Sequence, residues 1–175
     1  MINIIKRDGS SEPLNIEKLH KVVFYACEDI AGVSPSEVEI HSQVQLYDGM
    51  TTTEIQETLI KSAADLISEQ TPNYQWVAGR LINYHLRKMV YGQFEPWTLI
   101  DLVKKNVEIN VYDSQILSKY SKSDFTKLNN YIKHQRDDSL TYAAMEQFRG
   151  KYLVQNRVTK QIFETPQMAY MLIAM

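Results

Sequence analysis

Apolar residues recur at helical spacing through most of the chain and alternate with polar residues in only two short stretches. The opening "INIIKRDGSSEPL" is one of these, and it predicts two short strands joined around the turn dipeptide Asp8-Gly9. A helix is expected to begin at Asn15, a good N-cap residue, and to end near Gly32. Its apolar stripe is Leu19, Val22, Val23, Ala26 and Ile30.

Two further helices carry start signals. In "SPSE", Ser34 is the predicted N-cap, Pro35 takes the first helical position and Glu37 completes a capping box. In "TTTE", Thr51 and Glu54 repeat the capping-box pattern. We therefore expect helices to begin at both motifs.

A fourth helix, "NYQWVAGRLINYHLRKMVYG", is predicted to stop near Gly92, and "GQFEPW" is the best boundary in the chain. A hairpin and about four helices then form one domain, residues 1–93. Residues 94–175 are expected to be helical, with a second hairpin in "YLVQNRVTKQIFE". The fold class is mainly α (α+β).

The last predicted helix, "TPQMAYMLIAM", has Thr165 as its cap and Pro166 at its first position, followed by almost nothing but apolar residues. An exposed apolar terminus favours association. We expect the chain to be the first part of a larger protein, with further chain or another chain covering residues 168–175.

Composition places the protein among folded soluble proteins, with 44% apolar and 23% charged residues. The net charge of −2 gives no bulk electrostatic reason to expect a nucleic acid or an anionic membrane as partner. Cys27, the single cysteine, cannot form an internal disulfide or a thiolate zinc site. We expect a cytoplasmic protein without a metal of its own.

Motifs for catalysis are absent from the sequence, which has no GxxxxGK[ST], GxGxxG or HExxH pattern. Cys27 falls inside the first predicted helix, where a small core side chain is the ordinary interpretation. The four histidines lack ligand spacing. These residues do not compose a catalytic site.

A nucleotide site is a different matter, because several suitable groups gather near the first turn. Lys6 and Arg7 end the first predicted strand, and Lys18 lies one turn into the first helix. Asn15 marks that helix's N-terminus, whose free amides favour an anion. Glu12 and Asn15 can offer acceptor and donor groups to a base edge, while the cations neutralise phosphates.

Other candidates lie further along the chain. Arg87 and Lys88, near the end of the fourth helix, are possible extra cations, and Thr52 and Gln56 share one helix face. On spacing alone, a charged hairpin tip surrounded by solvent is the favoured interpretation, because a charged hairpin followed by a capped helix is common.

Four segments together resemble one known family. "KRDGSSEPLNIEKLHKV", "YDGMTTTEIQETLIKSAADLI", "PNYQWVAGRLINYHLRKMVYGQFEP" and "KYLVQNRVT" are similar to the N-terminal region of the large (alpha) subunit of class Ia ribonucleotide reductases. The first three resemble that family's ATP-cone, a regulatory nucleotide-binding domain. The resemblance covers essentially the whole chain.

The resemblance implies an allosteric effector, ATP for activity or dATP for inhibition, with Mg²⁺ on the triphosphate. It places Lys6, Arg7, Lys18 and Lys88 at the phosphates, Glu12 and Asn15 at the adenine, Ile4 and Leu19 along the base, and Thr52 near the sugar and phosphates. Gln56 stands where related bacterial subunits have a histidine near the ribose, which bears on the strength of dATP inhibition.

The resemblance also implies partners: the remainder of the large subunit, the small (beta) subunit, and further copies through the cone. The family's active-site cysteines lie beyond residue 175, so this chain alone is expected to be inactive. A cone kept only as an assembly scaffold remains an alternative. A nucleotide-sensing transcriptional repressor carries a four-cysteine zinc ribbon before its cone, which a chain with one cysteine cannot build.

Overall fold

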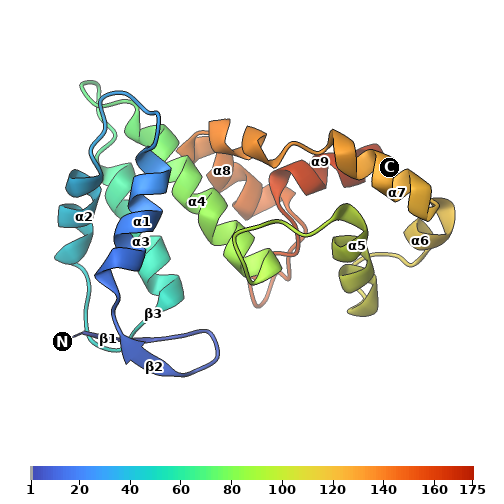
Figure 1. Cartoon of the computed structure of the whole chain (residues 1–175), viewed down its shortest axis with the longest axis horizontal. Helices are drawn as coiled ribbons and strands as arrows, with labels where there is room; N and C mark the ends of the chain where they lie inside the picture. Colours follow the sequence, from blue (N-terminus) through green and yellow to red (C-terminus); the bar gives the residue numbers. More distant parts are fainter. Residues whose placement is uncertain (1) are drawn as a thin grey trace. The chain divides into compact units, whose positions relative to one another are not determined.

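The computed structural model describes residues 2–175 and confirms the mainly α fold class, with a small three-stranded sheet (Figure 1). The chain divides into two compact units. The first unit comprises the residues up to His85 together with Ser139–Glu146, and the second comprises Leu86–Asp138 and Gln147–Met175. The division falls within helix α4 (Tyr74–Tyr91), and the boundary near residue 93 stays a prediction.

The sheet of the first unit has the strand order β2-β1-β3. β1 (Asn3–Ile5) pairs antiparallel with β2 (Ser11–Pro13), which confirms the predicted hairpin. Gly9 has a φ of +84°, the left-handed conformation that the turn requires. β3 (Met50–Thr51), which the sequence pattern did not predict, pairs parallel with β1.

The helices of the first unit are α1 (Ile16–Cys27), α2 (Pro35–Gln43), α3 (Thr52–Asp65), the first part of α4, and α8 (Tyr142–Gln147) as far as Glu146. Asn15 caps α1, since its Oδ1 accepts a hydrogen bond from the Lys18 backbone N–H at 2.9 Å. Thr51 and Glu54 form the predicted capping box at α3. Figure 1 shows α1 and α3 both starting beside the sheet.

The predicted capping box at α2 is wrong, although Pro35 does take the first helical position. Within residues 2–175, the Ser34 side chain makes no cap hydrogen bond. Glu37 instead accepts a hydrogen bond from the Tyr74 hydroxyl, which itself accepts the Ser34 backbone N–H at 3.0 Å. The Glu37 carboxylate, which the local pattern assigned to the N-cap of α2, is therefore hydrogen-bonded to a tyrosine that is distant in the sequence.

The predicted end of the first helix is also wrong. α1 ends at Cys27, before Ile30 and Gly32. Asp29 already has a φ of +57°, so the chain leaves the helical conformation there. Ile30 consequently lies beyond the helix whose stripe it was predicted to extend.

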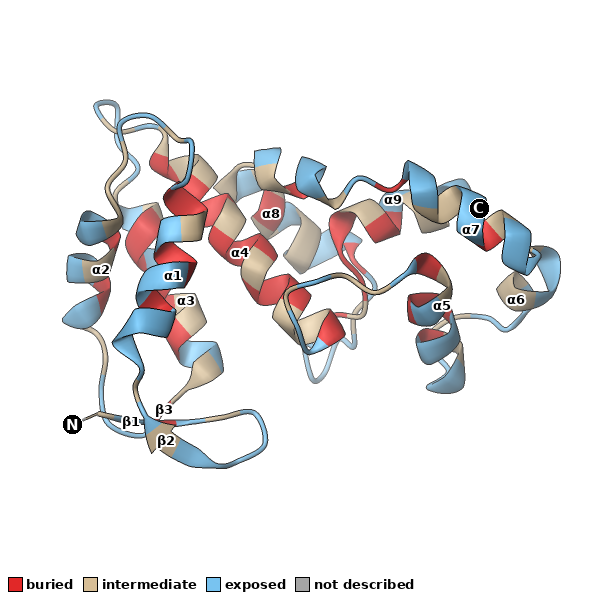
Figure 2. Ribbon diagram, viewed as in Figure 1, coloured by how far each residue is buried: buried red, intermediate tan, exposed pale blue. Residues whose placement is uncertain are grey.

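The core of the first unit forms where the helices face one another, and Figure 2 shows their inner faces buried and the hairpin mostly exposed. Gly79 of α4 lies at a close backbone approach within this unit. A Cβ atom at that position would meet the Leu140 carbonyl oxygen at 2.2 Å and the Thr141 carbonyl carbon at 3.0 Å. Only a glycine lets this segment pack so closely on the helix.

The second unit contains, besides the end of α4, the elements α5 (Leu99–Glu108), α6 (Gln115–Lys119), α7 (Lys122–Tyr131), a 3-10 helix η1 (His134–Ser139) up to Asp138, a π-helical segment η2 (Phe148–Tyr152) and α9 (Pro166–Ala174). Its buried cluster is Tyr91, Leu99, Leu102, Val103, Phe125, Ile132 and Met168. The predicted second hairpin is reduced to one antiparallel bridge between Gln155 and Ile162.

The last helix begins as predicted, with Thr165 in the N-cap position and Pro166 first in the helix. The Thr165 hydroxyl bonds with the Tyr91 hydroxyl at 2.8 Å, in place of the expected cap contact. Met168 is fully buried in the second unit's own cluster, so the expectation that further chain must cover it is wrong. Ile173, in contrast, is 83% exposed.

Candidate nucleotide-binding site

Three of the predicted site residues form one charged cluster in the first unit. Glu12 of β2 binds two lysines: its Oε2 lies 3.4 Å from Lys6 Nζ and its Oε1 lies 3.9 Å from Lys18 Nζ. Lys6 follows β1 directly, and Lys18 is in the first turn of α1. The hairpin and the capped helix thus bring together cations and a carboxylate that are separate in the sequence.

The hairpin loop that carries Arg7 has a defined shape. The Lys6 backbone N–H donates to the Ser10 carbonyl at 2.8 Å. Asp8 Oδ1 accepts from the Ser10 backbone N–H at 2.9 Å and from its hydroxyl at 2.6 Å, and these bonds lower the pKa of Asp8. Asp8 is thereby tied to the loop.

Arg7 is exposed on this loop, and it lies close enough to Tyr84 of α4 for its charge to affect the pKa of the Tyr84 hydroxyl. Burial raises the pKa of Tyr84, and the charge of Arg7 offsets part of that rise. Tyr84 is not among the site residues that the sequence predicts. Its position beside Arg7 depends on the packing of α4, which has no local sequence signal.

Strand β3 brings a second helix N-terminus to the sheet. Thr51 pairs with Ile5 of β1, and α3 begins at the next residue, Thr52. Asn3 holds this strand in place: its carbonyl accepts the Gly49 N–H at 2.8 Å and its own N–H donates to Asp48 Oδ1 at 2.7 Å. α1 follows β2 and α3 follows β3, so the N-termini of both helices lie near the sheet, and each carries partial positive charge.

The apolar and sugar-side candidates belong to the same unit. Ile4 and Leu19 are 7% and 8% exposed, so both are largely part of the core. Thr52 and Gln56 are half-buried on α3. Gln56 Oε1 is buried and accepts no hydrogen bond from the residues that the structure describes, which is unusual for a buried acceptor.

The cations near the end of α4 differ from one another. Arg87 is only 5% exposed; its Nη2 donates to the His134 carbonyl at 3.0 Å, and its guanidinium lies 4.9 Å from the Phe94 ring centroid. The interpretation of Arg87 as an extra phosphate-binding cation is therefore wrong, because the second unit buries it. Lys88 is half-buried in the last turn of α4, and its role stays a prediction.

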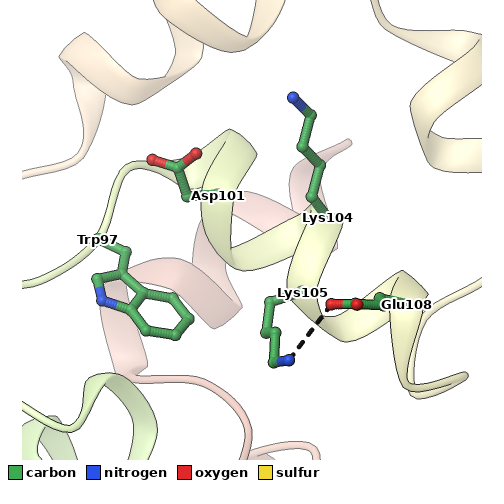
Figure 3. A pocket seen from close by; sticks show the side chains of 5 residues that line it. All are labelled: Trp97, Asp101, Lys104, Lys105 and Glu108. Atoms are coloured by element: carbon green, nitrogen blue, oxygen red, sulfur yellow. Dashed lines mark hydrogen bonds and ion pairs between the residues drawn. The ribbon is translucent and has the colours of Figure 1, made fainter.

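A separate open pocket of about 560 Å³ lies on the second unit (Figure 3). Trp97, Asp101, Lys104, Lys105 and Glu108 line it. Figure 3 shows the ion pair of 3.3 Å between Lys105 and Glu108. Two lysines and two carboxylates line this pocket, and none of the predicted nucleotide-site residues does.

Residues 2–175 contain no group of three or more histidine, cysteine or acidic residues able to hold a metal ion. Across the same part of the chain, none of the helices is both long and apolar enough to span a membrane.

Residues 2–89 match the ATP cone domain family, and the chain belongs to that family. Over 171 residues it is 50% identical to the ribonucleoside-diphosphate reductase 1 subunit alpha of Escherichia coli (strain K12), an alignment covering 98% of this chain and 22% of that protein. It is 44% identical over 177 residues to the ribonucleoside-diphosphate reductase subunit alpha of Enterobacteria phage T4, covering 100% of this chain and 23% of that protein.

A more distant relative, the ribonucleoside-diphosphate reductase subunit alpha of Helicobacter pylori (strain ATCC 700392 / 26695), is 38% identical over 176 residues, covering 100% of this chain and 22% of that protein. The chain thus spans less than a quarter of the length of these relatives. The resemblance to the reductase alpha subunits is confirmed along the whole chain.

Proposed function

We propose that the chain is the allosteric effector-binding segment of a class Ia ribonucleotide reductase large subunit, and that its first unit binds ATP or dATP. One observation carries the proposal: within an ATP-cone sequence, the Lys6–Glu12–Lys18 cluster lies at the small sheet from whose outer strands, β2 and β3, helices α1 and α3 begin. A polyphosphate needs such a concentration of cations and backbone N–H donors.

The residue roles follow the chemistry of each side chain. Lys6, Arg7 and Lys18 bind the phosphates, and Mg²⁺ accompanies the triphosphate. Lys88, which lies within the matched residues 2–89, is proposed as a further phosphate contact. Its assignment rests on the family pattern.

The nucleoside half has its own contacts. Glu12 accepts from the base and Asn15 donates through its amide N–H₂ group, since the cap uses only the Asn15 oxygen. Ile4 and Leu19 border the base with the small part of their surface that is exposed.

The sugar lies near Thr52 and Gln56 on α3. The buried Gln56 Oε1 supports this placement, because a hydroxyl donor from a ligand satisfies it. Since ATP and dATP differ by one hydroxyl, Gln56 is the residue whose contact bears on the choice between them.

The activity of the whole protein is proposed from its relatives: reduction of ribonucleoside diphosphates in the cytoplasm, with the remainder of the large subunit, the small subunit and further copies as partners. The chain itself is regulatory. Its one cysteine, Cys27, is buried, and burial raises its pKa to about 11, which keeps it a protonated thiol. A bound effector can change how the subunits assemble only if its affinity differs between the alternative assemblies of the subunits.

Calorimetric titration of this chain with ATP and with dATP, both with Mg²⁺, tests the effector site. We expect both to bind, and Lys6→Ala to weaken both by about tenfold or more, because a charged phosphate contact is lost. Lys61→Ala, an exposed lysine on α3 outside the cluster, is the matched control and should leave both affinities unchanged.

Absence of binding by both nucleotides to the folded chain contradicts the effector site. In that case the alternative holds, in which the domain is an assembly scaffold that contacts other subunits through its surface and does not bind a nucleotide.

A further inference from the structure

Helix α9 (Pro166–Ala174) has no charged side chain on any of its faces. Its sequence is PQMAYMLIA, in which Gln167 and Tyr170 carry the only polar side-chain groups. One face packs into the core of the second unit through Met168 and Ala169. A helix that is apolar all round is normally buried all round. α9 therefore has more apolar surface than residues 2–175 cover.

The uncovered surface of α9 continues onto η2. Tyr170 and Ile173 are three residues apart, so they share one helix face, and they are 52% and 83% exposed. The ring centroid of Phe148 lies 5.6 Å from that of Tyr170 and 6.0 Å from that of Tyr152, which is 66% exposed. We call these four residues, Phe148, Tyr152, Tyr170 and Ile173, the aromatic face.

Helix α5 of the same unit shows how a helix that faces water is built. It buries Leu102 and Val103 and exposes the charged side chains of Asp101, Lys104 and Glu108. The aromatic face differs, because none of its four residues is charged and they form one continuous surface across two elements. Single apolar residues are ordinary on a protein surface, whereas contiguous ones rich in tyrosine and phenylalanine mark a protein interface.

The length of the relatives indicates what covers this face. The chain spans 22% of the Escherichia coli subunit alpha and 23% of the phage T4 subunit alpha, so more than three quarters of such a subunit lies outside the aligned segment. In the proposed large subunit, the polypeptide continues from α9 itself. A segment tethered there is present at a high effective concentration, whereas a second copy must overcome the entropy of association.

Resting on the proposed function, we propose that the aromatic face is an internal docking surface, on which the part of the large subunit that follows α9 packs through an apolar surface of its own. The tyrosine hydroxyls stay at the edge of this interface, and the rings of Tyr152 and Tyr170 and the side chain of Ile173 supply its apolar contact.

Hydroxyl-radical footprinting with mass spectrometry tests the proposal by measuring the oxidation rate of each tyrosine. It compares this chain with a hybrid subunit, in which the chain replaces the aligned segment of the Escherichia coli ribonucleoside-diphosphate reductase 1 subunit alpha. We expect Tyr152 and Tyr170 to oxidise about fivefold or more slowly in the hybrid, because a packed interface excludes water. Tyr131, which is 74% exposed and outside the aromatic face, is the internal control and should keep its rate.

Sedimentation of the chain alone tests the rival occupant, a second copy, and can overturn the proposal without the hybrid. We expect a monomer. A dimer that Ile173→Glu dissociates would overturn the proposal, provided that Lys104→Glu, a charge change at an exposed residue of α5, leaves the dimer intact.

The footprinting result separates this proposal from the effector site. Unchanged oxidation of Tyr152 and Tyr170 in a folded hybrid that binds ATP overturns the docking surface and leaves the effector site standing. Protection of both tyrosines in a hybrid that binds neither ATP nor dATP supports the docking surface and contradicts the effector site.

Discussion

The two units hold carboxylates in opposite ways. Glu12 in the first unit is 35% exposed and meets two lysines within 4 Å. Asp137 in the second unit is fully buried, and among residues 2–175 its oxygens have no hydrogen-bond partner of good geometry, although Gln167 lies near it. The first arrangement can exchange partners with a ligand, and the second is fixed by the fold.

The environment of Asp137 is a cluster of buried ionisable groups in the second unit. Burial raises its pKa to about 7, and the nearby Gln167 amide and Arg87 charge offset only part of that rise. The charges of Asp137, Arg87 and Glu164 also affect the pKa of the nearby Tyr91 hydroxyl. Here charge bears on folding stability, whereas in the first unit it is proposed to serve ligand binding.

The largest expected effect is at Arg87, whose guanidinium is buried beside Asp137 and holds the His134 carbonyl. Arg87→Ala should lower the free energy of unfolding by about 2–4 kcal/mol, because it removes a buried side chain that packs on the Phe94 ring and leaves the His134 carbonyl without its charged donor. Urea denaturation measures this. Lys104→Ala, an exposed lysine in the same unit, is the control, and a loss as small as the control's would remove the contrast between the two units.

The next effect is a pH dependence set by Asp137. Its pKa is about 7 in the fold and 3.8 in the unfolded chain, so the folded state binds the extra proton between these values. Stability contributed by this group is greatest below about pH 4 and falls as pH rises to about 7, by about 1.4 kcal/mol per pH unit.

Asp137→Asn lacks this titration. The difference in unfolding free energy between the wild type and Asp137→Asn should therefore change across pH 4–7 and be flat above it. Curves that run parallel through this window contradict a raised pKa in the folded state.

A smaller effect is expected at Glu164, the second buried carboxylate of that unit. Its Oε2 accepts from the Tyr112 hydroxyl and its Oε1 from the Val154 N–H at 3.0 Å. Tyr112→Phe removes one donor and should reduce stability by about 1–3 kcal/mol in thermal or urea unfolding. Tyr131→Phe, at a tyrosine that is 74% exposed, should change nothing measurable; equal effects of the two variants would contradict the satisfied-carboxylate interpretation.

The smallest stability effect belongs to the exposed cluster. Lys6→Ala should reduce the free energy of unfolding by less than about 1 kcal/mol, since solvent screens the pair with Glu12. The same denaturation series measures it. A loss comparable with that of Arg87→Ala would show that the hairpin cations stabilise the fold, and would weaken the case that they are placed for a ligand.

Local signals in the sequence predicted the features that depend on neighbouring residues. Asp8-Gly9 marked the hairpin, Asn15 marked the start of α1, and the Thr51–Glu54 pair marked the start of α3. Each of these features is decided within about four residues, by turn chemistry or by a cap. Together they also placed Lys6 and Lys18 near one another.

Features that depend on distant partners were missed. β3 has two residues, too few for an alternating pattern, and its pairing with β1 is nonlocal. Glu37 accepts a hydrogen bond from Tyr74 of α4 in place of the predicted capping contact. The spacing of charged residues likewise did not indicate that Arg87 would be buried near Asp137. The candidate residues of α3 and α4, Thr52, Gln56 and Lys88, were named from the sequence, but the pairing of β3 with β1 that brings the start of α3 to the sheet was not predicted.

The close approach at Gly79 has a consequence for the order in which the chain can be completed. Leu140 and Thr141, which pack against Gly79, belong to the first unit but follow Leu86–Asp138 in the sequence. During synthesis the first unit therefore stays unfinished until the intervening segment has emerged, and a fragment cut near residue 93 lacks the backbone that covers α4 at this glycine. The first unit reaches its final form only after much of the region that follows it has been made.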